Sequence, residues 1–177
     1  MSVRLIRSIA AAAIAVSTIG LSQASAQFTT GPLYAGPHIW IGGLNGATAF
    51  GVQVEKGITS PGDAGPGIIS GGVGIDYYSW SYGFYGYKYT VVPIQAFSNY
   101  HFPIESNTQL DPYVGLALVY SYRSVTYANS TYSGGLGSSL DFAGHAGLRY
   151  FVSDNLAIHG QVGFGFGTLG IGVDWKF

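Results

Sequence analysis

The residues of this chain that could do chemistry occupy alternate positions in short stretches that are otherwise apolar. In an extended strand, such alternation sends polar and apolar side chains to opposite faces. The polar face carries Glu55, Asp76, Arg123, Asp141, His145, Arg149, His159, Gln161, Asp174 and Lys176. Carboxylate, imidazole and guanidinium groups on one shared face can form ion pairs, hold a metal ion or relay a proton.

Two histidines come nearest to a site for metal or acid–base chemistry. His145 and His159 fall in neighbouring antiparallel stretches and could face each other, with Asp141 one pair along from His145. Two lone histidines more often satisfy interior hydrogen bonds than hold a metal. Neither lies in a His-x-Ser sequence that would activate a nucleophile. We therefore expect no metal, no other cofactor and no catalytic residue, so the chain is not expected to be an enzyme.

Eight strands would position these side chains. In the clearest one, at the C-terminus, large apolar residues share one face and glycine, Asp174 and Lys176 share the other. The apolar face of this terminal strand carries Leu169, Ile171, Val173, Trp175 and Phe177. Seven earlier stretches alternate in the same way, at residues 38–44, 49–58, 67–79, 85–102, 112–125, 138–151 and 156–166. Eight strands close a small barrel with both chain ends on one side.

Turn-forming residues separate the predicted strands. Residues 80–84 form a short aromatic turn, and residues 126–137, rich in Asn, Ser, Thr and Gly, form the longest polar connection. Pro93 lies inside a predicted strand and lacks an N–H group, which predicts a bulge or a local break in the ladder.

The N-terminus has the pattern of a secretory signal peptide. Arg4 and Arg7 precede an apolar, alanine-rich run at residues 9–21, and Ala24-Ser25-Ala26 is a small-x-small cleavage site. We therefore divide the chain into a signal peptide (1–26), an N-terminal leader (27–37) and one barrel domain (38–177).

The composition limits the class of protein. Only 8% of the residues are charged, against about a quarter in soluble domains. The part after residue 26 has no apolar run long enough for a membrane helix, so its hydrophobicity is spread over short strands. Loss of Arg4 and Arg7 would take the formal charge from −1 to −3, which excludes a basic surface for nucleic acid. Cysteine is absent, so no disulfide contributes to stability.

Soluble alternatives remain for such alternating strands. A soluble sandwich would cover the apolar face with a second sheet, and a lipocalin-like barrel would enclose an apolar interior within a polar exterior. The second alternative conflicts with this sequence, because charged residues share their face with glycine, as small and charged side chains do in a narrow lumen.

Four segments of the chain resemble those of the small eight-stranded outer-membrane barrels of bacteria, the OmpA/OmpX-like proteins of the porin superfamily. They are residues 110–116, 148–151, 153–157 and 173–177. The resemblance implies an all-β, eight-stranded antiparallel up-and-down transmembrane barrel in the bacterial outer membrane, with both chain ends in the periplasm. It also implies that connections near Asn45, Ser81, Asn129 and Thr168 face the outside.

The resemblance also implies partners. In that family the barrel-assembly machinery reads a C-terminal aromatic residue in an alternating strand, which here implies Phe177, with Leu169, Ile171, Val173 and Trp175 as the rest of the signal. Outer-membrane lipid and lipopolysaccharide would surround the barrel, and we expect a monomer.

The expected function is a structural or surface-interaction role, with a lumen filled by paired polar side chains. An eight-stranded lumen is just wide enough for side chains, so interior charges are expected to pair. A narrow channel or small-solute-binding barrel is the first alternative, and a lipid-A-modifying enzyme the second. Aromatic residues concentrate toward the expected outer side, where they could form an interfacial girdle or, alternatively, stack on sugars: Tyr77, Tyr78, Trp80, Tyr82, Tyr85, Tyr87, Tyr120 and Tyr122.

Overall fold

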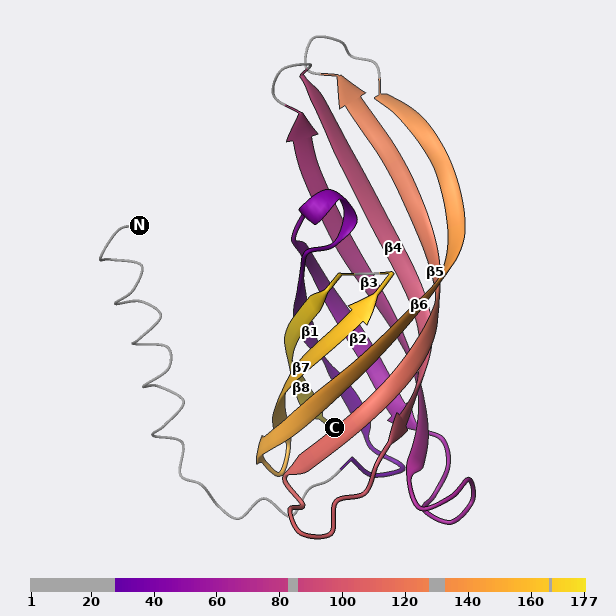
Figure 1. Cartoon of the computed structure of the whole chain (residues 1–177), viewed down its shortest axis with the longest axis vertical. Helices are drawn as coiled ribbons and strands as arrows, with labels where there is room; N and C mark the ends of the chain where they lie inside the picture. The colour runs from indigo at the N-terminus through magenta and orange to yellow at the C-terminus, as the bar shows by residue number, and fades with distance from the viewer. Residues whose placement is uncertain (1–27, 83–85, 128–132, 166) are drawn as a thin grey trace, which may run out of the picture.

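Eight strands close into one antiparallel barrel. Figure 1 shows a computed structural model of the chain, which describes residues 28–82, 86–127, 133–165 and 167–177. Each strand pairs with its neighbours in sequence, and β1 pairs with β8. The elements are β1 (Leu33–Ile41), the 3₁₀ turn η1 (Leu44–Gly46), β2 (Ala49–Gly57), β3 (Ile68–Tyr82), β4 (Tyr87–His101), β5 (Leu110–Tyr127), β6 (Ser133–Ser153), β7 (Leu156–Phe164) and β8 (Leu169–Lys176). The predicted up-and-down barrel is confirmed.

The predicted signal peptide, residues 1–26, lies outside the described residues. Within the described part of the chain, no helix is long and apolar enough to cross a membrane.

The two faces of the strands follow the predicted alternation. On β2, Phe50 and Val52 are exposed, whereas Gln53 and Glu55 are buried in the lumen. Burial alternates in the same way along β7 and β8. The barrel therefore has an apolar outer face and a polar interior, which is the reverse of a soluble barrel.

The first strand begins earlier than predicted. The sequence predicts a leader over 27–37, but β1 starts at Leu33, so the last five residues of that leader belong to the barrel wall. Gly36 and Pro37 interrupt the alternation of apolar and polar residues, so the sequence does not indicate a strand there. Gly36 is needed because the carbonyl oxygen of Val173 occupies the space in which a Cβ would lie.

Two prolines lie inside strands, at Pro37 and Pro93. Each keeps its pairing on one side, Pro37 with Val52 and Pro93 with Ser121. On the other side, the β1–β8 and β3–β4 ladders skip the proline and resume in the same register. The missing N–H of proline explains these interruptions. The local break predicted at Pro93 is confirmed, and it occurs without a shift of register.

Two predicted turns belong largely to strands. The sequence predicts turns over 80–84 and 126–137, but β3 continues to Tyr82, β5 reaches Tyr127 and β6 begins at Ser133. The remaining residues of these turns, 83–84 and 128–132, lie outside the described residues. The glycine-rich start of β6 has weak strand propensity, but pairing with β5 extends the strand through it.

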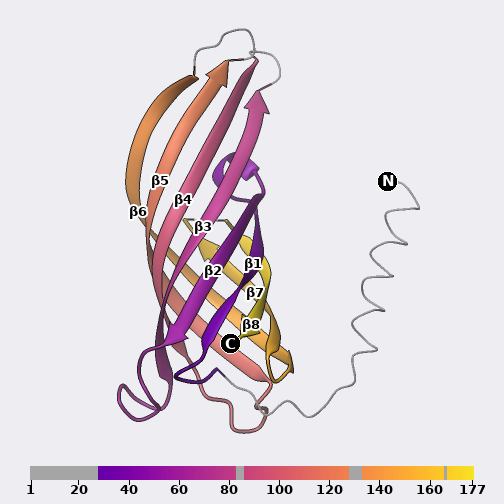
Figure 2. The same ribbon diagram turned by 180° about the vertical axis from the view of Figure 1, so that it is seen from behind.

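The strands differ greatly in length, and this divides the barrel into two halves. β1, β2, β7 and β8 have eight or nine residues, whereas β3 and β4 have 15, β5 has 18 and β6 has 21. Figures 1 and 2 show β3 to β6 rising well above the other four strands, at the end opposite the C-terminus. We call this extension the projecting wall: Ser79–Tyr82 of β3, Ser133–Ala143 of β6 and the segments of β4 and β5 between them.

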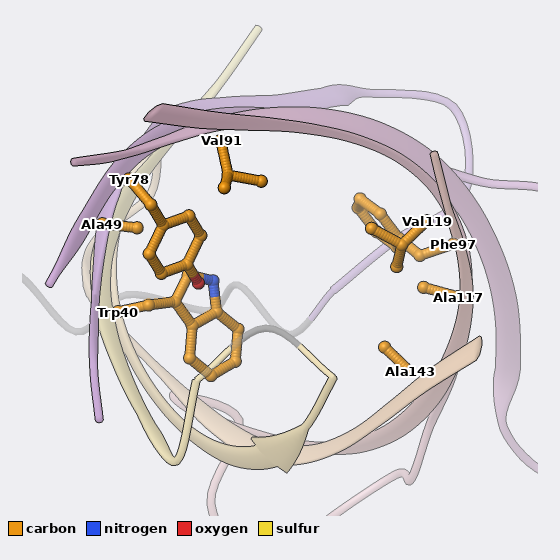
Figure 3. Packing of buried hydrophobic residues seen from close by; sticks show 8 residues of the cluster. All are labelled: Trp40, Ala49, Tyr78, Val91, Phe97, Ala117, Val119 and Ala143. Carbon is orange, nitrogen blue, oxygen red and sulfur yellow. The ribbon is translucent and has the colours of Figure 1, made fainter. Parts of the chain in front are cut away.

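Apolar side chains line the lumen below the projecting wall. Trp40, Tyr78 and Val119 are almost completely buried and belong to one hydrophobic cluster. Figure 3 shows this cluster inside the ring of strands, with Trp40 and Tyr78 lying against each other on one wall and Val119 beside Phe97 on the opposite wall. A second apolar cluster, containing Phe28 and Phe151, lies near the end of the barrel at which the chain ends. The polar side chains of the lumen lie between these two apolar clusters.

Candidate functional site

Arg149 is the centre of the largest group of charged side chains inside the barrel. Its guanidinium donates from Nη2 to Glu55 at 2.7 Å, from Nε to Asp174 at 2.8 Å and from Nη1 to Asp111 at 3.3 Å. None of the four side chains is more than 3% exposed. A buried guanidinium is tolerated only where carboxylates and hydrogen bonds replace its water, and these three carboxylates do so.

Two histidines extend this group. His101 lies with Nδ1 2.9 Å from Asp111 and with Nε2 3.0 Å from Glu55. His159 lies with Nδ1 2.7 Å from Asp174. Both imidazoles therefore bind carboxylates that Arg149 already holds. We call these six side chains the lumen network: Glu55, His101, Asp111, Arg149, His159 and Asp174.

Every strand supplies the lumen network or a side chain in contact with it. The six members come from β2, β4, β5, β6, β7 and β8. From β3, the buried hydroxyl of Ser70 donates to Glu55. From β1, the ring of Tyr34 lies 5.4 Å from the Cζ atom of Arg149, within range of a cation–π interaction. Because all eight strands take part, the network can form completely only when the barrel is closed in the correct register.

The N-terminal segment covers one side of the lumen network. Phe28 is 3% exposed, stacks on His101 with ring centroids 3.7 Å apart and lies 5.2 Å from the Cζ atom of Arg149. Thr29 fixes this position through a hydrogen bond of 2.9 Å from its N–H to the hydroxyl of Tyr34. Beyond Phe28, a pocket of about 370 Å³ lies against the connections 58–67 and 102–109. His101 and Asp111 line this pocket together with Phe28, so it reaches the edge of the lumen network, while the ring of Phe28 covers Arg149.

A smaller polar group lies elsewhere in the lumen. Asp76 accepts hydrogen bonds from Gln95 at 3.2 Å and lies 2.7 Å from Nε2 of His38. All three side chains are buried. A lone buried carboxylate would be costly, and these two neighbours supply the contacts it needs.

The structure places the residues that strand parity predicts for the lumen in different surroundings. Glu55, Arg149, His159 and Asp174 come together in the lumen network, and Asp76 belongs to the smaller group with His38.

Four other predicted residues lie apart from the network. Arg123 and Asp141 are 42% and 54% exposed in their side chains and 3.9 Å apart, in the projecting wall. Gln161 is buried and accepts a hydrogen bond from Tyr113. Lys176 is half-buried and makes no ion pair with any residue that the structure describes.

His145 and His159 do not face each other, which corrects the prediction. His145 pairs in the β6–β7 ladder with Gly163, and His159 pairs with Arg149, four residues farther along β6. The Nε2 atom of His145 lies 2.8 Å from the side-chain oxygen of Asn99. The slant of the register separates the two histidines, and strand parity alone contains no information on that slant.

Three important lumen residues were missed, namely His38, His101 and Asp111. A signal for His101 existed, because it shares its parity with Gln95 and Asn99, which the alternation places inside. His38 is the first residue of the predicted strand 38–44 and has the parity opposite to Ile39, whereas Asp111 lay in a segment predicted as a turn, so its parity was not counted. The error in the start of β5 therefore explains why Asp111 was missed, whereas His38 and His101 could have been found from their parity.

Ser70, His101 and Asp111 are hydrogen-bonded in the order found in a nucleophilic triad. The Ser70 hydroxyl lies 3.1 Å from Nε2 of His101, whose Nδ1 contacts Asp111. Ser70 is completely buried, however, and its hydroxyl donates to Glu55. An attacking serine needs access to a substrate and a base that accepts its proton. This arrangement provides no access, so it is better explained as interior hydrogen bonding.

The lumen has almost no free space beside the network. The space bounded by Trp40, Gln53, Tyr113 and Arg149 amounts to about 10 Å³, which is about the minimum for one water molecule. Among the described residues, no group of three or more His, Cys, Asp or Glu side chains is arranged to hold a metal ion. The arrangement can therefore hold charges in place, and the space on this side of Arg149 is too small for a solute.

Comparisons with known proteins agree on the fold. No protein-family model matches the chain, and no curated protein matches its sequence. The crystal structure of the N-terminal β-barrel domain of Pseudomonas aeruginosa OprF aligns with a TM-score of 0.50 and 18% identity, over 84% of this chain and 98% of that one. Ail, the attachment invasion locus protein of Yersinia pestis, aligns with a TM-score of 0.53 and 12% identity, over 82% and 97%.

A third similar structure is that of Neisserial surface protein A. It aligns with a TM-score of 0.53 and 17% identity, over 82% of this chain and 96% of that one. At such identities the likeness concerns the fold alone. The chain has the fold of the small eight-stranded outer-membrane barrels, as the resemblance in sequence implied.

Arg149→Met tests whether the lumen network stabilises the barrel. The change leaves three carboxylates buried without their guanidinium, so we expect the free energy of unfolding in lipid vesicles to fall by about 3–5 kcal/mol. Arg123→Met removes the same charge from an exposed pair and should change that free energy by only about 0–1 kcal/mol. Equal losses of the free energy of unfolding in urea titrations of the two variants would show that the buried network stabilises the barrel no more than an exposed ion pair does.

Proposed function

We propose that this chain is a bacterial outer-membrane barrel without a pore, which anchors the projecting wall outside the membrane for interaction with other molecules. The observation that carries the proposal is the division of the barrel into a closed short half and a tall half.

The short half has the dimensions of a membrane anchor. Transmembrane strands have about 9–11 residues, and β1, β2, β7 and β8 have eight or nine. Large apolar side chains cover the outside at this level, including Phe50 and Val162, which are 62% and 56% exposed. Such a surface is stable in lipid and would aggregate in water. The similar structures, which are outer-membrane barrels, support the same location.

The lumen supports a structural role over the channel alternative. Trp40 and Tyr78 are buried inside it toward the projecting wall, and the ion-paired lumen network lies below them. The remaining space of about 10 Å³ is too small for a row of water molecules or a solute. We propose no chemical reaction for the chain, because its one serine–histidine contact in the lumen is buried.

The projecting wall supports an interaction role. β7 pairs with β6 only from Gly144 onward, so the edge of Ser133–Ala143 has no neighbouring strand among the described residues. An unpaired edge offers N–H and C=O groups to an extended segment of a partner. Such an edge is not stable inside the hydrocarbon layer, which is a reason to place the wall outside it. Two of the similar structures are named as an attachment invasion locus protein and a surface protein.

Assembly and lipid contacts complete the proposal. The C-terminal aromatic residues Trp175 and Phe177 are exposed on the outer face, where the barrel-assembly machinery and then lipid could contact them. Lys88 is exposed near the projecting end of β4, where it could meet lipopolysaccharide phosphate. The expected monomeric state stays a prediction.

Single cysteines test the location and orientation directly, because the chain has no cysteine of its own. Ser138→Cys lies in the projecting wall and Ser60→Cys in the connection at the opposite end, and both positions are exposed. A membrane-impermeant maleimide should label Ser138→Cys on intact cells and Ser60→Cys only after the outer membrane is permeabilised. The reverse pattern, or recovery of the protein in the soluble periplasm, would refute the proposal.

Phe177→Ala tests whether the terminal aromatic ring is read during assembly. The backbone of Phe177 pairs with Leu33, and alanine keeps that pairing. We expect less protein in the outer membrane of growing cells, with unchanged unfolding after refolding in detergent, and a normal level for Phe177→Tyr. A normal outer-membrane level of Phe177→Ala would show that the ring is not part of a signal.

A further inference from the structure

Two aromatic residues that the sequence places in an interfacial girdle face the interior side instead. Tyr78 is completely buried, and Trp80 follows it on the same face of β3. The indole of Trp80 stacks on the ring of Tyr89, with centroids 5.6 Å apart and planes inclined by 10°. Tyr77, on the opposite face of β3, is exposed as a girdle residue would be. Trp80 and Tyr89 therefore do not face lipid, and a girdle does not explain them.

A polar group lies on the same face of the projecting wall. Arg123 of β5 donates from Nη2 to the hydroxyl of Ser139 at 3.0 Å, and that hydroxyl donates to Asp141 at 2.7 Å. About half of the Arg123 and Asp141 side chains is exposed, in contrast to the lumen network. This group is too exposed to contribute much to stability as an ion pair.

The aromatic and polar groups form one continuous surface across four strands. Trp80 pairs with Tyr89, and Tyr89 pairs with Val125, which lies two residues from Arg123 on the same face. Ser121, two residues before Arg123, pairs with Ser139 of β6. The surface therefore passes from a stacked aromatic pair to a guanidinium, a hydroxyl and a carboxylate without an intervening strand.

Two N–H groups on this surface lack an acceptor. The indole Nε1 of Trp80 and the guanidinium Nε of Arg123 are buried and have no hydrogen-bond partner within the described part of the chain. Such groups are uncommon in folded proteins, because an unmade hydrogen bond is costly. A small shift of either side chain toward a bound molecule rich in oxygen acceptors would remove this cost.

We propose that this face of the projecting wall binds a saccharide. An aromatic platform presents an apolar face to the C–H groups of a sugar ring, while a guanidinium and a carboxylate bind neighbouring hydroxyls as donor and acceptor. Trp80 and Tyr89 supply the platform, and Arg123 and Asp141 supply the polar contacts. The inference rests on the proposed function, since it requires the wall to lie outside the membrane.

The distance of this surface from the rim of the short half indicates the source of the sugar. Trp80 lies two residues beyond Tyr78, the last residue of β3 that pairs with β2, so the platform lies only about 7 Å along the strand from the rim of the short half. At that level, the sugars nearest the barrel are the core sugars of lipopolysaccharide. Figures 1 and 2 show that the short strands end below the upper part of the wall. The site is therefore assigned to the lipopolysaccharide core.

Calorimetric titration of the detergent-solubilised barrel with core oligosaccharide, released from lipopolysaccharide and freed of lipid A, tests the proposal. We expect saturable binding that Trp80→Ala weakens about fivefold to tenfold and that Trp80→Phe weakens less, because phenylalanine keeps a ring. Asp141→Asn should weaken binding to a similar degree, since it removes a charged acceptor. Maltotriose serves as a second ligand, and its tighter binding would overturn the assignment to the core.

Tyr122→Ser provides the matched control, because Tyr122 is exposed on the outer face of the same wall. It should leave oligosaccharide binding unchanged. Absence of binding, or equal loss from Tyr122→Ser and Trp80→Ala, would overturn the saccharide site. The cysteine-labelling pattern is independent of Trp80, so a correctly placed wall that binds no sugar would refute this inference alone. Folding of each variant is checked by its shift in electrophoretic mobility on heating.

Discussion

The ion pairs of Arg149 are the constraint on which the rest of the barrel depends. The guanidinium of Arg149 is buried away from water. The three carboxylates that pair with it come from β2, β5 and β8, on different sides of the lumen. Because the eight-stranded lumen is only as wide as its side chains, these groups meet at its centre. Removing any partner leaves an uncompensated charge, so the network favours one register of closure over neighbouring ones. The aromatic rings of Phe28 and Tyr34 then shield it from solvent.

In the function that we propose, a closed lumen explains the unequal lengths of the strands. The short strands are sufficient for an anchor, and a structure without a pore has no need for the extra length of β3 to β6 in conduction. That length instead forms a sheet with two different faces and, among the described residues, with an unpaired edge on each side, at Ser79–Tyr82 of β3 and Ser133–Ala143 of β6. The outer face is apolar near the rim, where Tyr120 and Tyr122 are exposed, and the inner face carries Trp80 and Arg123. The buried ion pairs of Arg149 lie at the level of the short strands, and the unpaired edge of β6 lies in the projecting wall.

The sequence predicts the fold and the faces of the strands well, because a period of two decides which side chains point inward. Glu55 and Phe50 are assigned correctly for this reason alone. Strand ends are less predictable: Ser133 and its glycine neighbours lie in a strand because β5 pairs with them, and Gly36 because a neighbouring carbonyl approaches it. Which charges meet is harder still. His145 and His159 share a face but lie four residues apart in register, whereas Asp111 reaches Arg149 from a segment that resembles a turn.

We propose that side chains close the lumen of the barrel. Conductance across a planar lipid bilayer shows directly whether ions can pass through it. Insertion of the refolded wild-type protein is first established by its protection from protease in vesicles. We expect no current above that of the bare bilayer at neutral pH, because the space that Trp40, Tyr113 and Arg149 bound inside the lumen is only about 10 Å³. Reproducible unitary conductance steps from the inserted wild-type barrel would contradict it.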